Sequence, residues 1–308
     1  MAKYIEKFIL PTEDDEIKLV RERMVHNGGP TLGWIDNTYP CGIFTAKKLT
    51  ELDFKNITIF YGGNGSGKST LLNLIANKLK LKRIAPFNGS ELFEGFVKNC
   101  KIQMAEDDEG YVYRSAPQNS RIITSDDIFD YMLTARENNS EISENSEELR
   151  DEWVGLKYGK TIQLNGVDNF EEFNKQVEAR RNSLTKRRFV YKLAGKQVKL
   201  NSNGETALDY FENKLDNDCL YLLDEPENSL SPKYQMSLVK FIEKNARYCG
   251  CQFVIATHSP FVLAIEGAKI YDLDNTPVDI KKWWELENTK TYYEFFKKNE
   301  NLFEGTGK

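Results

Sequence analysis

The segment from Gly62 to Ser69 combines glycines, a lysine and a serine at a spacing that suits phosphate binding. It lies between an apolar run and an apolar helical pattern and contains G-x-x-x-x-G-K-[ST]. Glycines let backbone N–H groups turn toward phosphate oxygens, Lys68 would reach the terminal phosphates, and the Ser69 hydroxyl would ligate Mg²⁺. A merely structural glycine turn would explain neither Lys68 nor Ser69. The predicted nucleotide-binding residues here are Gly62, Gly63, Asn64, Gly65, Ser66, Gly67, Lys68, Ser69 and Thr70.

Two carboxylates follow a second apolar run. Leu220–Leu223 has the composition of a buried parallel strand and is followed by Asp224 and Glu225. Sites in α/β proteins form at the carboxyl ends of such strands. Asp224 would hold Mg²⁺, and Glu225 would polarise a water molecule that attacks the terminal phosphate. A carboxylate pair alone could equally cap a helix, but together with the phosphate-binding loop it predicts hydrolysis.

A histidine and a Ser/Gly segment add two further candidates. His258 follows the apolar run Phe253–Ala256, at the expected end of another buried strand. We therefore predict that His258 contacts the terminal phosphate, although a lone histidine is more often structural. Ser202 and Gly204 precede an apolar helical pattern, so the start of that helix is a second candidate anion site. An ordinary helix cap with a glycine turn is the alternative for this segment.

The elements that position these residues indicate an α/β fold. We expect a mostly parallel core sheet, antiparallel strands near the N-terminus and a helical insertion. The predicted division is an N-terminal lobe at 1–125, an insertion at 126–189 and a C-terminal lobe at 190–308. The expected elements are a strand at Tyr4–Leu10, a hairpin at Lys101–Arg114, helices at Asp126–Arg136 (capped by Ser125) and Phe170–Arg188, a strand at Ala268–Leu273, and a helix at Thr291–Lys298 packed on the head. The insertion has no sustained heptads, so long coiled-coil arms are not expected.

Composition narrows the class of protein. The chain has 308 residues, 40% of them hydrophobic, and a formal net charge of −5. Its five cysteines form no C-x-x-C motif, and it has two histidines, so neither a disulfide framework nor a zinc site is expected. No apolar segment has the length of a membrane span or the character of a signal peptide. We therefore expect a cytoplasmic protein without a membrane span.

One segment departs from the acidic average. Eight Lys and Arg residues and no acidic residue lie between Arg180 and Lys199. Contact with a nucleic-acid backbone is one interpretation. A solvated helix followed by a strand, balanced by the acidic segment before it, is the other and is favoured, because Phe189 and Tyr191 provide little aromatic interleaving.

Four blocks in a fixed order resemble the head of the ABC-type ATPases. They are the phosphate-binding loop, S-N-G-E from Ser202 to Glu205, Y-L-L-D-E-P-E from Tyr221, and I-A-T-H-S-P from Ile255. The similarity runs from about residue 50 to 275, is greatest to the SMC/RecF/OLD-like branch, and extends to short bacterial proteins described as AAA family ATPases. It implies a P-loop NTPase fold and Mg²⁺-dependent ATP hydrolysis in which Lys68, Glu225 and His258 are catalytic.

The resemblance also implies a dimer. Ser202, Asn203, Gly204 and Glu205 occupy the signature position, which in such proteins closes over the ATP held by a second subunit. Asn228–Ser231 would be the D-loop at that interface, in a homodimer with two sandwiched nucleotides. Asn201 and Ser231 depart from the usual Leu and Asp of the family, which leaves the strength of dimer coupling in doubt.

Two details and the biological role are left open. In these ATPases a glutamine contacts Mg²⁺ and the attacking water, and Gln118 is better placed than Gln103. Trp34, Tyr39 and Phe44 are candidates for stacking on adenine. Action on DNA in genome maintenance or phage defence, recruitment of an effector nuclease or toxin, and service as the nucleotide-binding subunit of a transporter are the three hypotheses.

Overall fold

A computed structural model describes residues 3–28, 37–87, 89–134, 153–158, 160, 170–180, 203–228 and 230–303. The chain divides into two compact units. The first contains Met1–Phe129 and Ala207–Lys308, and the second contains Asp130–Thr206. The assignment of residues 126–189 to an insertion between two lobes remains a prediction.

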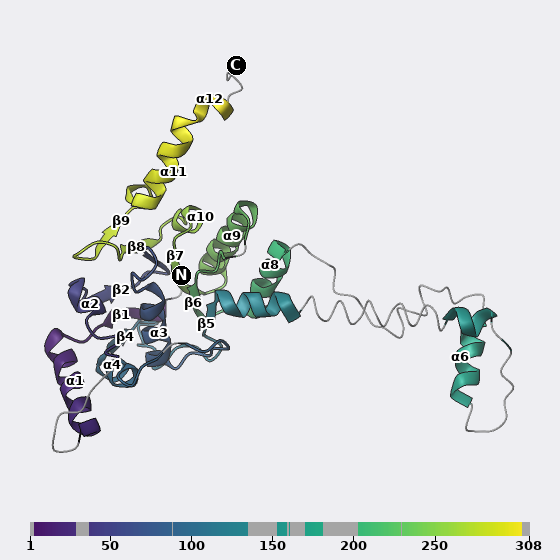
Figure 1. The fold of residues 1–308 in the computed structure, drawn as a ribbon, viewed down its shortest axis with the longest axis horizontal. Coiled ribbons are helices and arrows are strands. Elements are labelled where there is room, and N and C mark those ends of the chain that lie inside the picture. Colours follow the sequence, from purple (N-terminus) through teal and green to yellow (C-terminus); the bar gives the residue numbers. More distant parts are fainter. Residues whose placement is uncertain are drawn as a thin grey trace. The chain divides into compact units, whose positions relative to one another are not determined.

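Figure 1 shows the larger sheet of the first unit. Among the described residues, this sheet has six strands. In spatial order they are β5 (Arg121–Thr124), β6 (Leu220–Asp224), β7 (Gln252–Thr257), β3 (Ile57–Tyr61), β8 (Lys269–Asp272) and β9 (Asp279–Lys281). The first five are parallel, and β9 pairs antiparallel with β8. The central strands β3 and β7 are buried along their whole length, as continuous apolar runs in a covered parallel sheet must be. This confirms the predicted α/β class with a mostly parallel core sheet.

A smaller antiparallel sheet accounts for the predicted N-terminal strands. It consists of β2 (Glu51–Asp53), β1 (Ile5–Ile9) and β4 (Lys101–Met104). The side chain of Gln252, fully buried at the start of β7, accepts hydrogen bonds from the backbone N–H groups of Tyr4 and Ile5 at 2.7 and 2.9 Å. Gln252 therefore joins the two sheets through a polar contact inside the core.

Helices cover the sheets and bury their apolar positions. α3 (Lys68–Leu79) packs on β6 and β7 through Leu71, Leu72, Leu74 and Ile75, all fully buried. α9 (Pro232–Tyr248) buries Leu238 and Ile242. The other helices of this unit are α1 (Glu13–Gly28), α2 (Ile43–Ala46), α4 (Phe93–Asn99), most of α8 (Asn203–Lys214), α10 (Pro260–Leu263), the 3₁₀ helix η1 (Trp283–Glu285), α11 (Glu287–Lys298) and α12 (Glu300–Phe303).

Two expectations from the sequence are wrong in detail. The helix at 125–134 is capped by Thr124 rather than Ser125: Thr124 Oγ1 accepts from Asp127 N–H at 3.3 Å, while Asp127 Oδ2 accepts from Thr124 N–H at 2.8 Å. The C-terminal helix was expected to pack on the head. Its first turn does so, because Asn288 donates to the Tyr61 hydroxyl and to the His258 carbonyl and Thr289 is buried. The later part of α11 extends away from the sheets (Figure 1), and its aromatic side chains are exposed. Those residues are Tyr292, Tyr293, Phe295 and Phe296.

The described part of the second unit is helical. A short helix at 153–158 buries Trp153, and α6 (Phe170–Arg180) bonds to it where Arg180 Nε donates to the Leu156 carbonyl at 3.3 Å. The second half of the predicted helix and most of the basic segment, residues 181–199, lie outside the described residues. Across the described chain, no helix is long and apolar enough to cross a membrane.

Candidate active site

The phosphate-binding loop connects the carboxyl end of β3 to the start of α3. Gly65 and Gly67 have φ angles of 79° and 100°, in the left-handed region that side chains disfavour. A Cβ atom on Gly67 would lie 3.2 Å from side-chain atoms of both Ile43 and Phe44. Phe44 is only 1% exposed and belongs to the core beneath the loop, so it is not available to stack on adenine.

Lys68 is the first residue of α3, and its side chain reaches back to the loop. Its side chain is 5% exposed, and Nζ donates to the carbonyl oxygens of Gly62 at 2.7 Å and Gly63 at 3.0 Å. Nζ also lies 3.6 Å from Glu225 Oε1. The buried ammonium group is thus held between the loop carbonyls and the carboxylate that follows β6.

Ser69 and Asp224 meet across the sheet edge. Ser69 Oγ donates to Asp224 Oδ1 at 3.0 Å, although the two residues belong to different elements. Burial raises the pKa of Asp224 to about 6, while the hydrogen bond from Ser69 acts in the opposite direction. A hydroxyl and a desolvated carboxylate are suitable oxygen ligands for Mg²⁺. Among the described residues no group of three or more His, Cys, Asp or Glu side chains could hold a metal, so nucleotide oxygens and water would have to complete the coordination.

Glu225 and His258 face one another at the ends of β6 and β7. The Nδ1 atom of His258 lies 3.6 Å from Glu225 Oε1, and Asn228 Nδ2 donates to Glu225 Oε2 at 2.9 Å. Glu225 has a φ angle of 47°, which is unusual for a residue with a long side chain. Its backbone N–H nevertheless donates to the Ala256 carbonyl at 2.9 Å, which fixes the turn against β7.

Several predicted site residues are not brought to this edge. Gln118 lies in the turn before β5, and β5 runs parallel to β6 with Thr124 opposite Asp224. Gln118 is therefore at the amino end of its strand, away from Asp224, and its prediction as a metal ligand is wrong. Gln103, the alternative, lies on the separate antiparallel sheet.

The signature residues are only partly described. Ser202 lies outside the described residues, as do Asn201 and the candidate adenine-stacking residue Trp34. Asn203 and Gly204 begin α8, where Glu205 is exposed in the first turn. Among the described stacking candidates, Tyr39 contacts the loop helix through its hydroxyl, which donates to Thr70 Oγ1 at 3.1 Å.

Three residues that the sequence analysis did not single out also contribute to this edge. Asp274, just after β8, accepts the Gly63 N–H through both carboxylate oxygens, at 3.0 and 2.9 Å. Glu227 is buried beside His258, and Asn288 at the start of α11 donates to the His258 carbonyl at 2.9 Å. Asp274, Glu225, His258 and Asn288 line a cavity of about 610 Å³ next to the phosphate-binding loop. Asp274 directly follows the strand predicted at Ala268–Leu273, but its contact with Gly63 depends on the pairing of β8 with β3, which the sequence does not show.

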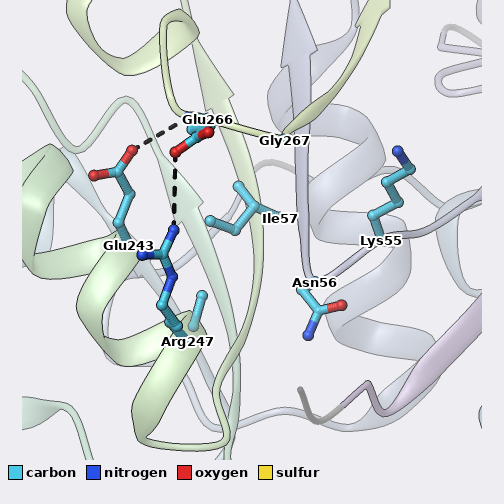
Figure 2. Close-up of a pocket in the computed structure, with 8 residues that line it drawn as sticks. Lys55, Asn56, Ile57, Glu243, Arg247, Glu266 and Gly267 are labelled. Carbon is cyan, nitrogen blue, oxygen red and sulfur yellow. Dashed lines mark hydrogen bonds and ion pairs between the residues drawn. The ribbon is translucent and has the colours of Figure 1, made fainter.

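A second cavity, of about 320 Å³, lies at the opposite ends of the strands (Figure 2). Three of its charged residues are linked to each other: Arg247 lies 3.8 Å from Glu266, whose backbone N–H donates to Glu243 at 3.2 Å. Lys55 and Asn56, just before β3, complete the labelled rim. Because ligands of parallel α/β sheets bind at the carboxyl ends of the strands, the cavity beside the phosphate-binding loop is the candidate active site.

The charge of Asp274 should oppose nucleotide binding. We expect Asp274→Asn to tighten ATP binding about two- to fivefold, because the amide oxygen still accepts the Gly63 N–H while a negative charge near the triphosphate is removed. Titration with a fluorescent ATP analogue at low and high salt measures this, and the gain should shrink as salt screens the charge. Asp108→Asn, in an exposed turn, is the control. Weaker binding by Asp274→Asn would show that the carboxylate supports the loop instead.

Loop, lysine, serine and strand-end carboxylates together define a P-loop nucleotide hydrolase. The model of the family described as "ABC transporter" matches residues 50–228, more than half of the chain. The chain therefore belongs to this family of ABC-type ATPases and is an ATP-binding ATPase. A second model, described as "AAA domain, putative AbiEii toxin, Type IV TA system", matches residues 215–264. No curated protein matches the sequence.

Solved structures with a similar fold include three ATPase heads. The SMC head domain from Thermotoga maritima has 16% identity and a TM-score of 0.37, covering 75% of this chain and 92% of its own. The Pyrococcus furiosus Smc head domain bound to a ScpA domain has 12% identity and a TM-score of 0.37, covering 80% and 94%. A dimeric ATP-binding cassette bound to ADP and Pi has 17% identity and a TM-score of 0.34, covering 76% and 90%. These low scores add nothing to the family assignment.

Proposed function

We propose that this protein is a Mg²⁺-dependent ATPase head of the SMC/RecF/OLD-like branch that forms a homodimer around two ATP molecules and acts on DNA. In this proposal it works in the bacterial cytoplasm, in genome maintenance or phage defence. The observation that carries the enzymatic part is the meeting of Lys68, Asp224, Glu225 and His258 at one sheet edge, from three separate elements.

Each group has a distinct task in the proposed hydrolysis. Ser69 and Asp224 would hold Mg²⁺, which would neutralise charge on the phosphates. Lys68 leaves its loop carbonyls to contact the terminal phosphates. Glu225 orients the attacking water, and His258 contacts the γ-phosphate through the side of its ring that faces the cavity.

One residue of the proposed dimer interface is hydrogen-bonded to the carboxylate of Glu225. Asn228 opens the predicted D-loop and donates to Glu225 Oε2 at 2.9 Å. A second subunit that contacted Asn228 would therefore act directly on the orientation of Glu225. The signature residues Ser202–Glu205 would supply the helix-start N–H groups that close over the partner's nucleotide.

Binding to DNA is proposed from charge. The basic segment 180–199 holds eight cations without an acid, in a chain whose net charge is −5. We expect the triple substitution of Lys186, Arg187 and Arg188 by Gln to weaken DNA binding about 10-fold or more and to lower the salt dependence of binding, since each phosphate contact contributes about one unit to the slope. Fluorescence anisotropy with a labelled duplex at several salt concentrations measures both.

A matched control removes three cations elsewhere. Lys233, Lys240 and Lys244 are exposed on α9, and their substitution by Gln changes the net charge equally. If both triple variants lose affinity to the same extent, binding is non-specific attraction. If DNA neither binds the wild type nor changes its ATP turnover, the DNA part of the proposal is wrong.

Two other roles fit the ATPase. The family description favours a transporter's nucleotide-binding subunit, which predicts that the native protein fractionates with membranes. The description of the model that matches residues 215–264 favours a switch that recruits an effector, which predicts slow turnover and an ATP-dependent protein partner. ATP-dependent pull-down from fractionated cells of the source organism separates these alternatives.

A further inference from the structure

Glu227 is a buried carboxyl group in the turn after β6. Its side chain is 3% exposed, although Glu225, two residues earlier, is 25% exposed. Burying a carboxyl group is costly unless it forms hydrogen bonds. Burial raises the pKa of Glu227, and Oε2 has no hydrogen-bond partner among the described residues. Burying Glu227 with Oε2 unpaired lowers the stability of the fold. The contacts of its other carboxylate oxygen can explain why a carboxyl group is placed here.

The other oxygen, Oε1, accepts hydrogen bonds from three consecutive residues at the end of β7 and in the loop that follows it. It accepts from the Thr257 hydroxyl, from the His258 N–H at 3.3 Å and from the Ser259 N–H at 3.3 Å. The Ser259 N–H is shared with Thr257 Oγ1 at 3.0 Å. One oxygen atom therefore fixes three consecutive residues at the end of the strand that carries the histidine.

Hydrogen bonds fix the backbone of His258, whereas its imidazole ring is partly exposed. Glu227 accepts its N–H, and Asn288 Nδ2 donates to its carbonyl at 2.9 Å. The imidazole is 48% exposed, and its Nδ1 atom faces Glu225 at 3.6 Å and Glu227 at 3.9 Å. His258 lines the cavity beside the phosphate-binding loop, and it also lines a neighbouring cavity formed with Pro260 and Phe261.

We propose that Glu227 is a positioning residue for ATP hydrolysis, which holds the Thr257–Ser259 loop so that His258 can report the γ-phosphate. It also joins the turn after β6, which carries Glu225, to the loop after β7. Beside the contacts of Glu225 with Ala256 and His258, this buried carboxyl group is a further link between the two loops. This inference rests on the proposed role of His258.

The test compares ATP and ADP, which differ by the group that His258 would contact. Glu227→Met keeps the volume but removes the acceptor, and Glu227→Asp retracts it by one methylene. We expect each variant to lower kcat at least 10-fold. We also expect each to lower the ratio of ATP affinity to ADP affinity to the ratio found for His258→Ala. Glu227→Gln retains an accepting oxygen and should restore both to within about threefold of the wild type. In a Glu227→Met/His258→Ala double variant, the effect of Glu227→Met should disappear.

The outcomes separate the inference from the proposal on which it rests. If His258→Ala changes neither kcat nor the ATP preference, the role proposed for His258 is wrong. If His258→Ala has its effect but Glu227→Met and Glu227→Asp behave like the wild type, the positioning role is overturned. It is also overturned if these variants weaken ATP and ADP equally and lower only the thermal unfolding temperature, because that is the result of a purely structural role. Should Glu227→Met not fold, the Asp and Gln variants decide.

Discussion

Replacing Glu225 by Gln should lower kcat for ATP hydrolysis about 10²- to 10³-fold while leaving ATP binding intact. The amide has the shape of the carboxylate and can still accept the hydrogen bond from Asn228. It cannot act as a general base, because an amide does not accept a proton from the attacking water. Lys68 and Ser69, which would bind the nucleotide and its metal, are unchanged. Turnover is measured by phosphate release, and affinity by titration with a fluorescent ATP analogue.

The same variant should reveal the dimer. Because ATP is bound but not consumed, we expect Glu225→Gln with Mg²⁺ and ATP to accumulate at twice the monomer mass in light scattering, whereas ADP leaves it monomeric. Glu266→Gln, an exposed position at the opposite ends of the strands, is the matched control and should hydrolyse ATP normally. A Glu225→Gln protein that stays monomeric and turns over ATP at the wild-type rate contradicts both the base and the sandwich dimer.

Replacing Lys68 by Met should instead act on binding. Each hydrogen bond between an ammonium group and a charged partner contributes about 1.5–3 kcal/mol to binding. We therefore expect ATP affinity to fall about 10- to 100-fold, with a smaller loss for ADP. Isothermal titration calorimetry at fixed Mg²⁺ measures both, and circular dichroism establishes that the fold is kept.

Lys98→Met is the control for Lys68→Met. Lys98 is exposed on α4, so its loss removes the same charge from the protein without touching the phosphate-binding loop. Unchanged ATP affinity in the Lys68 variant would mean that the ammonium group keeps its bonds to the Gly62 and Gly63 carbonyls when nucleotide binds.

The sequence was sufficient where chemistry is local. The phosphate-binding loop, the apolar run before Asp224 and the run before His258 are continuous segments whose strand ends can be predicted one at a time. Since parallel strands share a carboxyl edge, these residues were also expected to meet. The fold class followed from the same runs.

The sequence was insufficient where position depends on strand order. Gln118 was chosen by its distance along the chain from Lys68, but the placement of β5 beside β6 puts Thr124 at the active edge instead. Asp274 reaches Gly63 only because β8 pairs with β3, a contact between distant parts of the chain. Nothing in the sequence distinguishes Glu227 from a solvated acid in a turn, and its burial depends on the loop after β7. The exposure of the α11 aromatics likewise could not be derived from their apolar character.

The left-handed backbone at Glu225 has a consequence for engineering this protein. A non-glycine residue at such a φ angle costs about 1–2 kcal/mol of stability. This is an appreciable part of the free energy of unfolding of a typical domain, which is about 5–15 kcal/mol. Glycine or asparagine would relieve this strain, so a screen for heat resistance alone would favour their appearance at position 225. Such proteins would survive heating and lack the carboxylate assigned to the attacking water. Thermal selection on this chain therefore has to be coupled to a turnover assay.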